Sequence, residues 1–349
     1  MGTRFIFFLL FVFSINSTFG TEKIQSYQIS VSHPNIQTIA ELFEIKDRQQ
    51  DKLIVYVLQE QAKNFKRLAP EARLLNSDIN FEIRTKQLNG YHNLQQVKDL
   101  YYQLASQHSA IAKIEKYGSS RQGKQLFALK VSDNVLADEN EPKVLFTSAT
   151  HGDELITVEV QLRLVRELIK GVESDPRLRK MIEGRALYFI PVVNPDGFVR
   201  RSRYASNRVD PNRDYPWPDR PNRISRVKSI GHLIEYFQKN QFKGSMDIHA
   251  SGKMVMFPWG FTRKPINSAD YQKMDQLTKN MAKENRYRQG PISKVIYVAK
   301  GSSADYYYWK NSTMALAVEL TTSKVPSASK IPQVVAEARE MVWKFIESF

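Results

Sequence analysis

The feature that most constrains this chain is a set of ionisable residues that each follow a short apolar run. His151 and Glu154 come directly after residues 143–147, Lys-Val-Leu-Phe-Thr, and precede a long helical pattern. His249 follows Gly-Ser-Met-Asp-Ile, and Glu319 follows Met-Ala-Leu-Ala-Val. Such runs are typical of buried strands, and open α/β sheets place functional groups where strands end. We therefore expect these four side chains to form one site at the edge of a sheet.

The residue types at this edge predict a metal. Two imidazoles and one carboxylate that leave a fourth position open are the ligands of a catalytic zinc ion. His151, Glu154 and His249 supply this set. Because the chain contains no cysteine, thiolate zinc sites, disulfides and a cysteine nucleophile are all excluded. We therefore predict one Zn²⁺ ion per chain.

The spacing His-x-x-Glu is weak evidence alone, because a second copy occurs at His232 and Glu235. This copy lies within residues 231–241, whose apolar spacing suits a helix, and no strand precedes it. We interpret it as a surface or structural feature. Glu319 is harder to explain structurally, since an ionisable group that follows five apolar residues needs a partner or a function.

The start of the chain has the pattern of a secretory signal at residues 1–20. Arg4 supplies the positive charge, residues 5–13 are almost entirely apolar, and a polar stretch ending at Gly20 follows. The apolar run is too short to span a membrane, and no other stretch approaches that length. We therefore expect a secreted or periplasmic protein with no stable membrane insertion.

Two units follow the expected signal. Residues 21–85 alternate between strand and helix patterns, which predicts a small α/β N-terminal domain. A polar, basic link at residues 82–87 joins it to residues 86–349, where the alternation continues on a larger scale. For this larger part we predict an α/β fold, a mixed parallel and antiparallel twisted sheet with helices on both faces.

The apolar patterns also predict individual elements. We expect strands at residues 27–32, 53–58, 112–117, 126–131, 143–147, 186–193, 244–248, 254–257 and 314–318. We expect helices at residues 36–43, 59–68, 94–106, 231–241, 269–284 and 331–348, and one that follows Glu154 and runs to about Gly171. Asn194–Gly197, Asn-Pro-Asp-Gly, predicts a turn.

The formal net charge is +15, and most of the excess lies after residue 90. Basic charge of this size can indicate nucleic acid, an anionic cell envelope or an acidic substrate. No nucleic-acid-binding module accompanies it, so we expect no nucleic-acid partner. A solubilising surface explains most of these residues. One cluster is denser than solubility requires, and it comprises Arg200, Arg201, Arg203, Arg208 and Arg213.

From Tyr91 to Phe349 the sequence resembles the zinc carboxypeptidases of the carboxypeptidase A type, peptidase family M14. The family's motifs occur here in the family's order. They are the metal ligands His151, Glu154 and His249, the turn Asn194–Gly197, the oxyanion-stabilising Arg203, the carboxylate-binding pair Asn212 and Arg213, the mobile Tyr297 and the catalytic Glu319. Any one match is weak evidence, but this many in order make chance implausible.

The resemblance implies a metallocarboxypeptidase, which hydrolyses the C-terminal peptide bond of peptides. Glu319 would be the general base for a water that zinc activates, and Arg203 would help zinc to stabilise the oxyanion. Arg213 would bind the terminal carboxylate through two hydrogen bonds, together with Asn212 and Tyr297. The expected partners are peptides with a free C-terminus, and the expected assembly is a monomer.

Three further positions bear on this interpretation. Asp210, two positions before Asn212, is a candidate hydrogen-bond acceptor for a zinc-binding imidazole. The sequence departs from the family pattern at Pro211, where leucine is common, and at Arg208, which adds a cation near the substrate end. Residues 21–85 stand where the family's zymogens carry an activation domain, which suggests a pro- or cap-like role.

The resemblance also places Ala304 at the base of the pocket for the C-terminal side chain. Its expected walls are apolar and consist of Met256, Ala299 and Ala317. Such a pocket favours bulky neutral side chains, whereas Lys253 or Lys300 would favour an acidic end if either reached in. We expect aromatic or large aliphatic C-terminal residues to be preferred, acidic residues second and basic residues least.

Other functions stay open on the sequence alone. An exported basic protein could be a carboxypeptidase of cell-wall (peptidoglycan) peptides, with D-amino-acid or diamino-acid ends. An inactive relative could bind peptide ends or an anionic envelope without hydrolysis, although such relatives commonly lose a ligand or the general base. A nucleic-acid binder is the weakest alternative, because the basic residues fall within the catalytic pattern.

Overall fold

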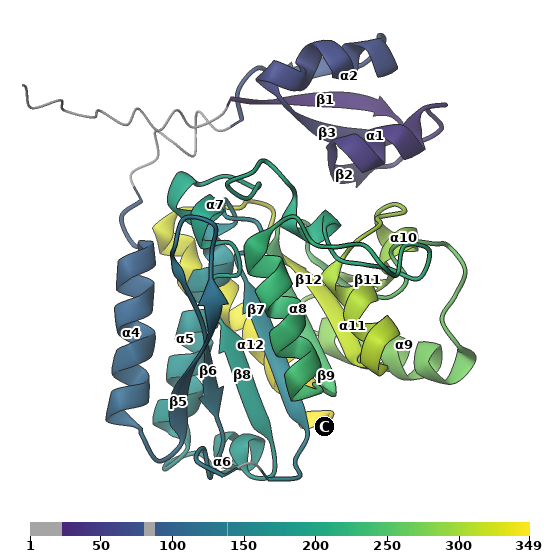
Figure 1. Ribbon diagram of the computed structural model, residues 1–349. Helices are drawn as coiled ribbons and strands as arrows, with labels where there is room; N and C mark the ends of the chain where they lie inside the picture. The colour runs from purple at the N-terminus through teal and green to yellow at the C-terminus, as the bar shows by residue number, and fades with distance from the viewer. Residues whose placement is uncertain (1–22, 80–87, 138) are drawn as a thin grey trace, which may run out of the picture.

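The computed structural model describes residues 23–79, 88–137 and 139–349. The expected signal lies outside these residues, as does the expected link at residues 82–87. The described chain forms a small N-terminal unit and a larger unit (Figure 1). None of its described helices combines the length and the apolar character that crossing a membrane requires.

The N-terminal unit is a four-stranded sheet of order β2-β3-β1-β4 with two α-helices. Its elements are β1 (Ile24–Ser30), α1 (Ile36–Leu42), β2 (Glu44–Gln49), β3 (Lys52–Leu58), the 3-10 helix η1 (Gln59–Gln61), α2 (Ala62–Leu68) and β4 (Arg73–Asn76). Phe65 of α2 is fully buried against the rings of Tyr27 and Phe43. The small α/β character was predicted, but β2 was missed because it contains a single apolar residue.

The larger unit is built on an eight-stranded mixed sheet of order β11-β10-β12-β9-β7-β8-β6-β5. The strands are β5 (Ala112–Ser119), β6 (Gln125–Val131), β7 (Lys143–Ser148), β8 (Ala186–Ile190), β9 (Gly244–Ala250), β10 (Met254–Phe257), β11 (Arg288–Pro291) and β12 (Met314–Leu320). The four central strands, β8, β7, β9 and β12, are parallel to one another. Antiparallel pairs flank them on both sides, as the predicted mixed sheet requires.

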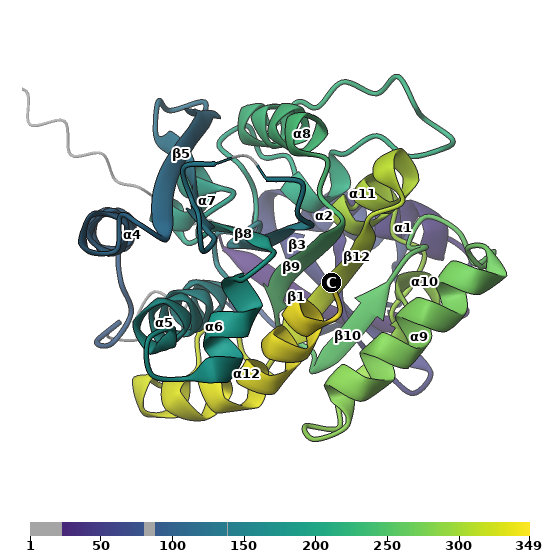
Figure 2. The same cartoon turned by 90° about the horizontal axis from the view of Figure 1, so that it is seen from below.

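Helices cover both faces of this sheet, as predicted: α5 and α12 lie on one face, and α8 and α11 lie on the other (Figure 2). The helices are α4 (Leu94–Gln107), α5 (Leu155–Gly171), α6 (Pro176–Ile182), α7 (Pro195–Arg200), α8 (Lys228–Asn240), α9 (Ser268–Ala282), α10 (Ile292–Val295), α11 (Ser303–Asn311) and α12 (Ile331–Glu347), with the 3-10 turns η2 (Pro211–Arg213) and η3 (Ala328–Lys330). The expected turn at Asn194–Gly197 is instead the start of α7, because the Asn194 side chain accepts a hydrogen bond from the Gly197 N–H at 2.9 Å and caps the helix.

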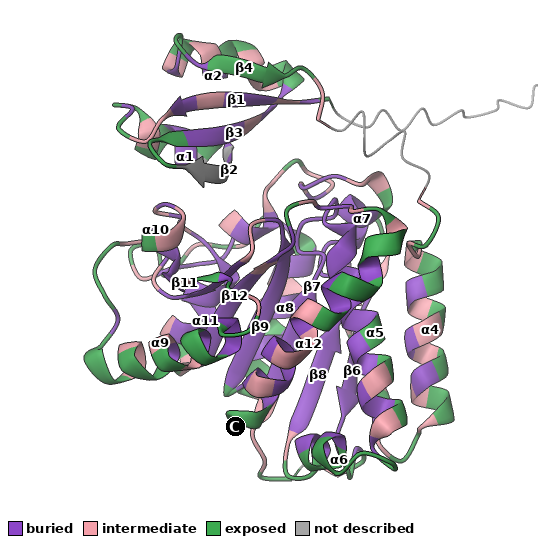
Figure 3. Cartoon of the chain, turned by 180° about the vertical axis from the view of Figure 1, so that it is seen from behind, coloured by how far each residue is buried: buried purple, intermediate pink, exposed green. Residues whose placement is uncertain are grey.

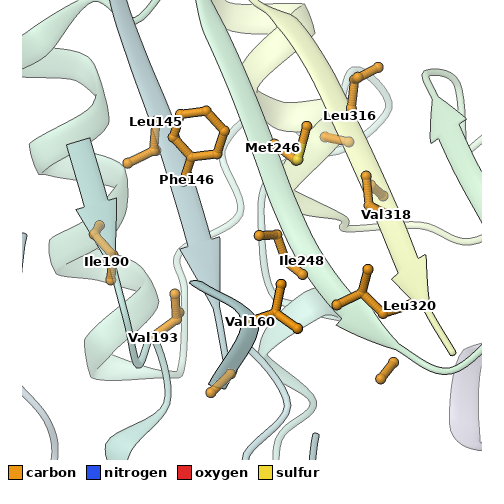
Figure 4. Close-up of a cluster of buried hydrophobic side chains, with 14 of the residues drawn as sticks. Leu145, Phe146, Val160, Ile190, Val193, Met246, Ile248, Leu316, Val318 and Leu320 are labelled. Carbon is orange, nitrogen blue, oxygen red and sulfur yellow. The ribbon is translucent and has the colours of Figure 1, made fainter. Parts of the chain in front are cut away.

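A continuous apolar core fixes the central strands. Side chains from β7, β8, β9, β12 and α5 interdigitate around Phe146, Ile248 and Val160 (Figure 4). These three side chains are at most 3% exposed, and burying each stabilises the fold by roughly 1.5–3 kcal/mol. The central strands β7, β8, β9 and β12 are almost entirely buried, whereas the outer helices are exposed along one side (Figure 3). Buried strands of this kind hold their ends in fixed positions.

The N-terminal unit lies over the edge of the sheet at which the parallel strands end, on the side of α7 and opposite α6 (Figure 1). Glu60 reaches from this unit to Arg208, with 2.6 Å between the carboxylate oxygen and the guanidinium nitrogen. Lys324, which follows β12, places its ammonium 5.8 Å from the centre of the Tyr56 ring. The carboxyl ends of the central strands therefore lie beneath a second unit.

Candidate metal centre and active site

The parallel register of the central strands brings the predicted residues together. His249 of β9 and Glu319 of β12 are directly paired, so their side chains point to the same face. Thr147 of β7 is paired with Asp247 of β9, which places the turn that follows β7 beside His249. His151 and Glu154 belong to that turn, and α5 begins immediately after it. Residues far apart in sequence thus meet at one edge, as predicted.

His151, Glu154 and His249 form a compact and buried donor set. Each residue is at most 3% exposed, and their potential ligand atoms lie within 4.8 Å of one another. The Nδ1 atoms of the two histidines are 3.2 Å apart. The Glu154 carboxylate oxygens lie 2.9 Å from His151 Nδ1 and 3.1 Å from His249 Nδ1. Three donors therefore converge on one point.

The opposite nitrogen of each imidazole faces a carboxylate. His151 Nε2 lies 3.2 Å from an Asp210 oxygen, and His249 Nε2 lies 3.0 Å from an Asp247 oxygen. An Nε2–H that donates to these carboxylates leaves the Nδ1 lone pair directed at the shared centre. Two oriented imidazoles and one carboxylate fit a zinc ion. The predicted acceptor Asp210 lies where the sequence placed it.

Asp247 is a functional residue that the sequence analysis missed. Its two oxygens accept hydrogen bonds from Thr147 at 2.8 Å, Thr150 at 3.0 Å and Ser303 at 2.7 Å. Burial raises the pKa of Asp247, but His249 and these donors outweigh it and hold the pKa below its usual value. The available signal was its spacing, because residues two apart on a strand point to the same face.

The electrostatics of the centre favour a cation. Burial lowers the pKa of His249, but the carboxylates of Asp247 and Glu154 outweigh it and raise that pKa well above its usual value. Burial likewise raises the pKa of Glu154, but His151 and His249 hold it well below its usual value. Buried carboxylates that outnumber fixed positive groups require a positive charge between them.

Arg203 lies at the rim of this centre. Its Nε and Nη2 atoms donate to one Asp210 oxygen at 3.0 and 2.8 Å. Its Nη1 atom lies 3.1 Å from His151 Nδ1 and 4.0 Å from a Glu154 oxygen. Although burial raises the pKa of Asp210, the charges of Arg203 and His151 hold it well below its usual value. The guanidinium is thus fixed with one nitrogen directed at the centre.

Asn212 and Arg213 belong to η2, which the Asp210 side chain caps by accepting from the Asn212 N–H at 2.9 Å. The Asn212 side-chain Oδ1 accepts from the Ser303 N–H at 3.0 Å. Arg213 Nη2 donates to the Tyr297 hydroxyl. A side chain at position 301 would place its Cβ 2.6 Å from the Arg213 carbonyl oxygen, and Gly301 has φ +78°, so only glycine fits there.

All nine predicted site residues line one cavity. They are His151, Glu154, Arg203, Asn212, Arg213, His249, Tyr297, Ala304 and Glu319. The predicted walls Met256, Ala299 and Ala317 line it as well, and the sequence analysis missed four apolar neighbours, Met254, Ile292, Ile296 and Ile45. The last of these belongs to β2 of the N-terminal unit. The cavity therefore joins the candidate metal centre to an apolar chamber. The chamber is lined by Ile45, Met254, Met256, Ile292, Ile296, Ala299, Ala304 and Ala317.

The side chains of Lys253 and Lys300 lie outside this chamber. Lys253 and Lys300 do not line it: Lys253 lies 3.3 Å from a Glu337 oxygen, and Lys300 lines a neighbouring cavity. Asp305 follows Ala304, but its carboxyl accepts from the N–H groups of Gly260 and Phe261, each at 2.7 Å. Burial raises the pKa of Asp305 to about 7. Among the described residues, the cavity is therefore lined by no ionisable side chain other than those of the predicted site.

The second His-x-x-Glu pair is not part of a comparable donor set. His232 and Glu235 lie on α8, with 3.5 Å between His232 Nδ1 and a Glu235 oxygen. The Glu235 side chain is 76% exposed. Among the described residues, His232 belongs to no group of three potential metal ligands. The interpretation of this pair as a surface feature agrees with its position.

Comparison with known sequences identifies a family. A family model described as "Zinc carboxypeptidase" matches residues 97–341. A zinc carboxypeptidase of Saccharothrix mutabilis subsp. capreolus is 26% identical over 269 residues, which cover 66% of this chain and 62% of that protein. Mouse carboxypeptidase A4 is 25% identical over 268 residues, which again cover 66% of this chain and 62% of that protein. The chain thus spans less than two thirds of either relative.

Solved structures share the fold. Carboxypeptidase A from Helicoverpa armigera superposes with a TM-score of 0.77 at 17% identity, covering 94% of this chain and 98% of that one. A metallo-carboxypeptidase from Burkholderia cenocepacia gives a TM-score of 0.60 at 13% identity, covering 95% of this chain and 82% of that one. The mixed α/β architecture is therefore one that these proteins share.

We predict that His249→Ala and Glu154→Ala each lose most bound zinc while keeping most of the fold, because each change removes one of three donors. Elemental analysis of purified protein measures zinc, and circular dichroism checks the fold. His232→Ala is the matched control and should retain full zinc. Full occupancy in either ligand variant would rule out that residue as a ligand.

Proposed function

Because this chain belongs to the zinc carboxypeptidase family, we propose that it hydrolyses the C-terminal peptide bond of peptides that carry a free carboxylate. The observation that carries the proposal is that one cavity contains the metal donor set, Glu319 and Arg213. A metal, a base and a carboxylate-binding cation in one cavity are the groups this reaction requires. Release of a C-terminal residue from a blocked dipeptide tests the proposal.

Glu319 is the proposed general base. Bound zinc supplies Lewis acidity, which polarises a carbonyl and acidifies water. The Glu319 carboxylate accepts the proton of the attacking water and returns it to the leaving amine. Its pairing with His249 places it beside the donor set. Arg203, with Nη1 at the rim of the centre, stabilises the negative charge that develops on the carbonyl oxygen.

Arg213 is the proposed anchor for the terminal carboxylate. A guanidinium can bind a carboxylate through two parallel hydrogen bonds, which a lysine cannot do. Asn212 and Tyr297 line the same cavity and offer further donors. Tyr297 holds Arg213 through its hydroxyl, so the cation is positioned before a substrate arrives. Exopeptidase specificity follows, because only a chain end presents a carboxylate at this position.

The preferred C-terminal residue is proposed to be aromatic or large and aliphatic. Ala304 at the base leaves space, and the surrounding walls are apolar. Asp305 would attract a basic side chain only if its carboxylate faced the chamber, but it is turned towards Gly260 and Phe261. The comparisons favour neither the cell-wall nor the inactive alternative.

The N-terminal unit is proposed to shield the site. Ile45 lines the cavity, whose volume is about 60 Å³, whereas ligand sites commonly measure about 300–1,000 Å³. A bulky C-terminal residue cannot enter until β2 moves away. The expected link, at residues 82–87, is the place at which cleavage would release this unit.

We predict that Glu319→Gln retains zinc and substrate binding but lowers kcat by roughly 10²–10⁴-fold, because the base is lost while the shape is kept. Steady-state kinetics and metal analysis measure both effects. Near-normal kcat in this variant would end the general-base assignment.

Substituting Arg213→Ala should abolish the preference for a free C-terminus, because the carboxylate loses its cation. Free and amidated forms of one peptide should become equally poor substrates. Arg177→Ala, which removes an arginine from distant α6, is the control and should keep the preference. Strong discrimination in Arg213→Ala would assign the carboxylate to another cation, such as Arg208.

For side-chain preference, we expect kcat/KM on blocked dipeptides to be highest for C-terminal Phe or Leu, lower for Glu and lowest for Arg. The physical reason is burial in a neutral apolar chamber. A clearly higher kcat/KM for C-terminal Arg than for Phe or Leu would refute the pocket assignment. If kcat/KM were highest for C-terminal Glu, Lys300 or Lys253 would have to reach the substrate.

A fragment that starts near Lys86 should have higher specific activity than the chain with residues 21–85 attached, because the N-terminal unit no longer borders the cavity through Ile45. Both proteins are assayed with the same small substrate after equal zinc loading. Equal specific activities would discard the shielding role and leave the N-terminal unit as a structural cap.

A further inference from the structure

A second and larger cavity adjoins the site on the side of the N-terminal unit. Its volume is about 590 Å³, within the range of ligand sites. Arg213 lines both cavities, so the two are continuous at the proposed carboxylate anchor. Residues between 204 and 226, which follow Arg203, form most of one wall, and Ala40, Leu42, Phe43 and Gln61 of the N-terminal unit form part of the other. We call this cavity the basic groove.

The basic groove carries an excess of cations. Six basic residues line it, Arg208, Arg213, Arg220, Arg223, Arg226 and Lys300. Among the described side chains that line it, two are acidic, Asp210 and Asp219, and Asp210 is already bound to Arg203. A concave surface with one sign of charge concentrates ligands of the opposite sign. The groove therefore suits a ligand that carries several negative charges.

A buried carboxylate organises this wall. Asp214 is fully buried, and it accepts hydrogen bonds from Arg223, from Ser225 and from the N–H groups of Arg226 and Val227. Arg223 and Arg226, whose guanidinium nitrogens lie 3.0 and 3.7 Å from an Asp214 oxygen, share this one negative charge. Arg220 and Arg223 each place their guanidinium carbon 5.5 Å from the centre of the Trp217 ring. These contacts fix the two cations beside an apolar surface.

A segment of the N-terminal unit borders the basic groove. This segment, residues 40–45, extends from the basic groove, which residues 40, 42 and 43 line, to the site cavity, which Ile45 lines. The sequence of this segment is Ala-Glu-Leu-Phe-Glu-Ile, which combines acidic and apolar residues. Nearby, the Glu60 carboxylate lies 2.6 Å from Arg208. The groove thus borders apolar side chains of this segment, and one of its cations is paired with a carboxylate of the same unit.

We propose that the basic groove binds acidic peptide segments and directs the enzyme towards substrates that carry such segments near their C-termini. A peptide is the favoured ligand because the groove opens into a peptide site and because Trp217, Val209 and Val298 place apolar surface among the cations. The link to cleavage depends on the proposed function, but binding to the groove does not.

The test is a binding measurement on the full-length, zinc-loaded chain. The probe is a fluorescent Ala-Glu-Leu-Phe-Glu-Ile peptide with an amidated C-terminus, and its comparison peptide carries Gln in place of both Glu residues. We expect the acidic peptide to bind about tenfold more tightly than the Gln peptide, and we expect this difference to shrink as salt is added. Equal binding of the two peptides would overturn the proposal.

The matched variants locate the binding surface. Arg220→Gln/Arg226→Gln removes two exposed cations and keeps the Arg223–Asp214 pair, and it should abolish the preference for the acidic peptide. Lys170→Gln/Lys180→Gln removes the same charge from distant exposed positions and should leave it intact. If both variants lost the preference for the acidic peptide, or if neither did, the assignment of binding to the groove would be overturned.

Two further measurements separate the remaining outcomes. If a sulfated polysaccharide binds in an Arg220- and Arg226-dependent manner while the acidic peptide does not bind, the peptide assignment is wrong. In hydrolysis assays after the N-terminal unit has been released at the link, an acidic residue upstream of a constant C-terminal Phe should lower KM, and this effect should be absent in Arg220→Gln/Arg226→Gln. Peptide binding by the full-length chain without any hydrolysis after release of the N-terminal unit would contradict the proposed function and leave the groove assignment standing.

Discussion

The site depends on the register of three parallel strands. β7, β9 and β12 are buried on both faces, and their pairing sets Glu319 beside His249 and Thr147 beside Asp247. Because side chains alternate along a strand, a slip of one residue would turn each of these groups to the opposite face. The apolar side chains around Phe146 oppose such a slip (Figure 4). The core packing that fixes the register of these strands therefore also fixes the geometry of the site.

Two carboxylates orient the histidines of the site. Asp247 and Asp210 each hold the outer nitrogen of one histidine, and each is held in turn by fixed donors. Removing several carboxylates from water is costly unless a cation lies between them. A zinc ion held by His151, Glu154 and His249 would supply this positive charge. Binding of zinc and folding of this edge are consequently linked.

Much of this arrangement could be predicted because the informative residues follow apolar runs. His249 and Glu319 were identified from the strands that precede them, and His232 was excluded because it has none. Asp247 was missed, since a residue that supports a ligand resembles any polar residue in a strand. The position of Ile45 could not be predicted, because contact between two units depends on surfaces that no local pattern describes. Likewise, α7 replaced a predicted turn because capping by Asn194 extends the chain into a helix.

The most direct test of the metal centre is anomalous diffraction at the zinc edge from crystals of the zinc-loaded protein. The structure predicts one strong peak within bonding distance of Nδ1 of His151, Nδ1 of His249 and the Glu154 carboxylate. It also predicts that Nε2 of each histidine stays with Asp210 or Asp247. A peak at His232, ligation through either Nε2, or the absence of a peak at this triad would contradict the account.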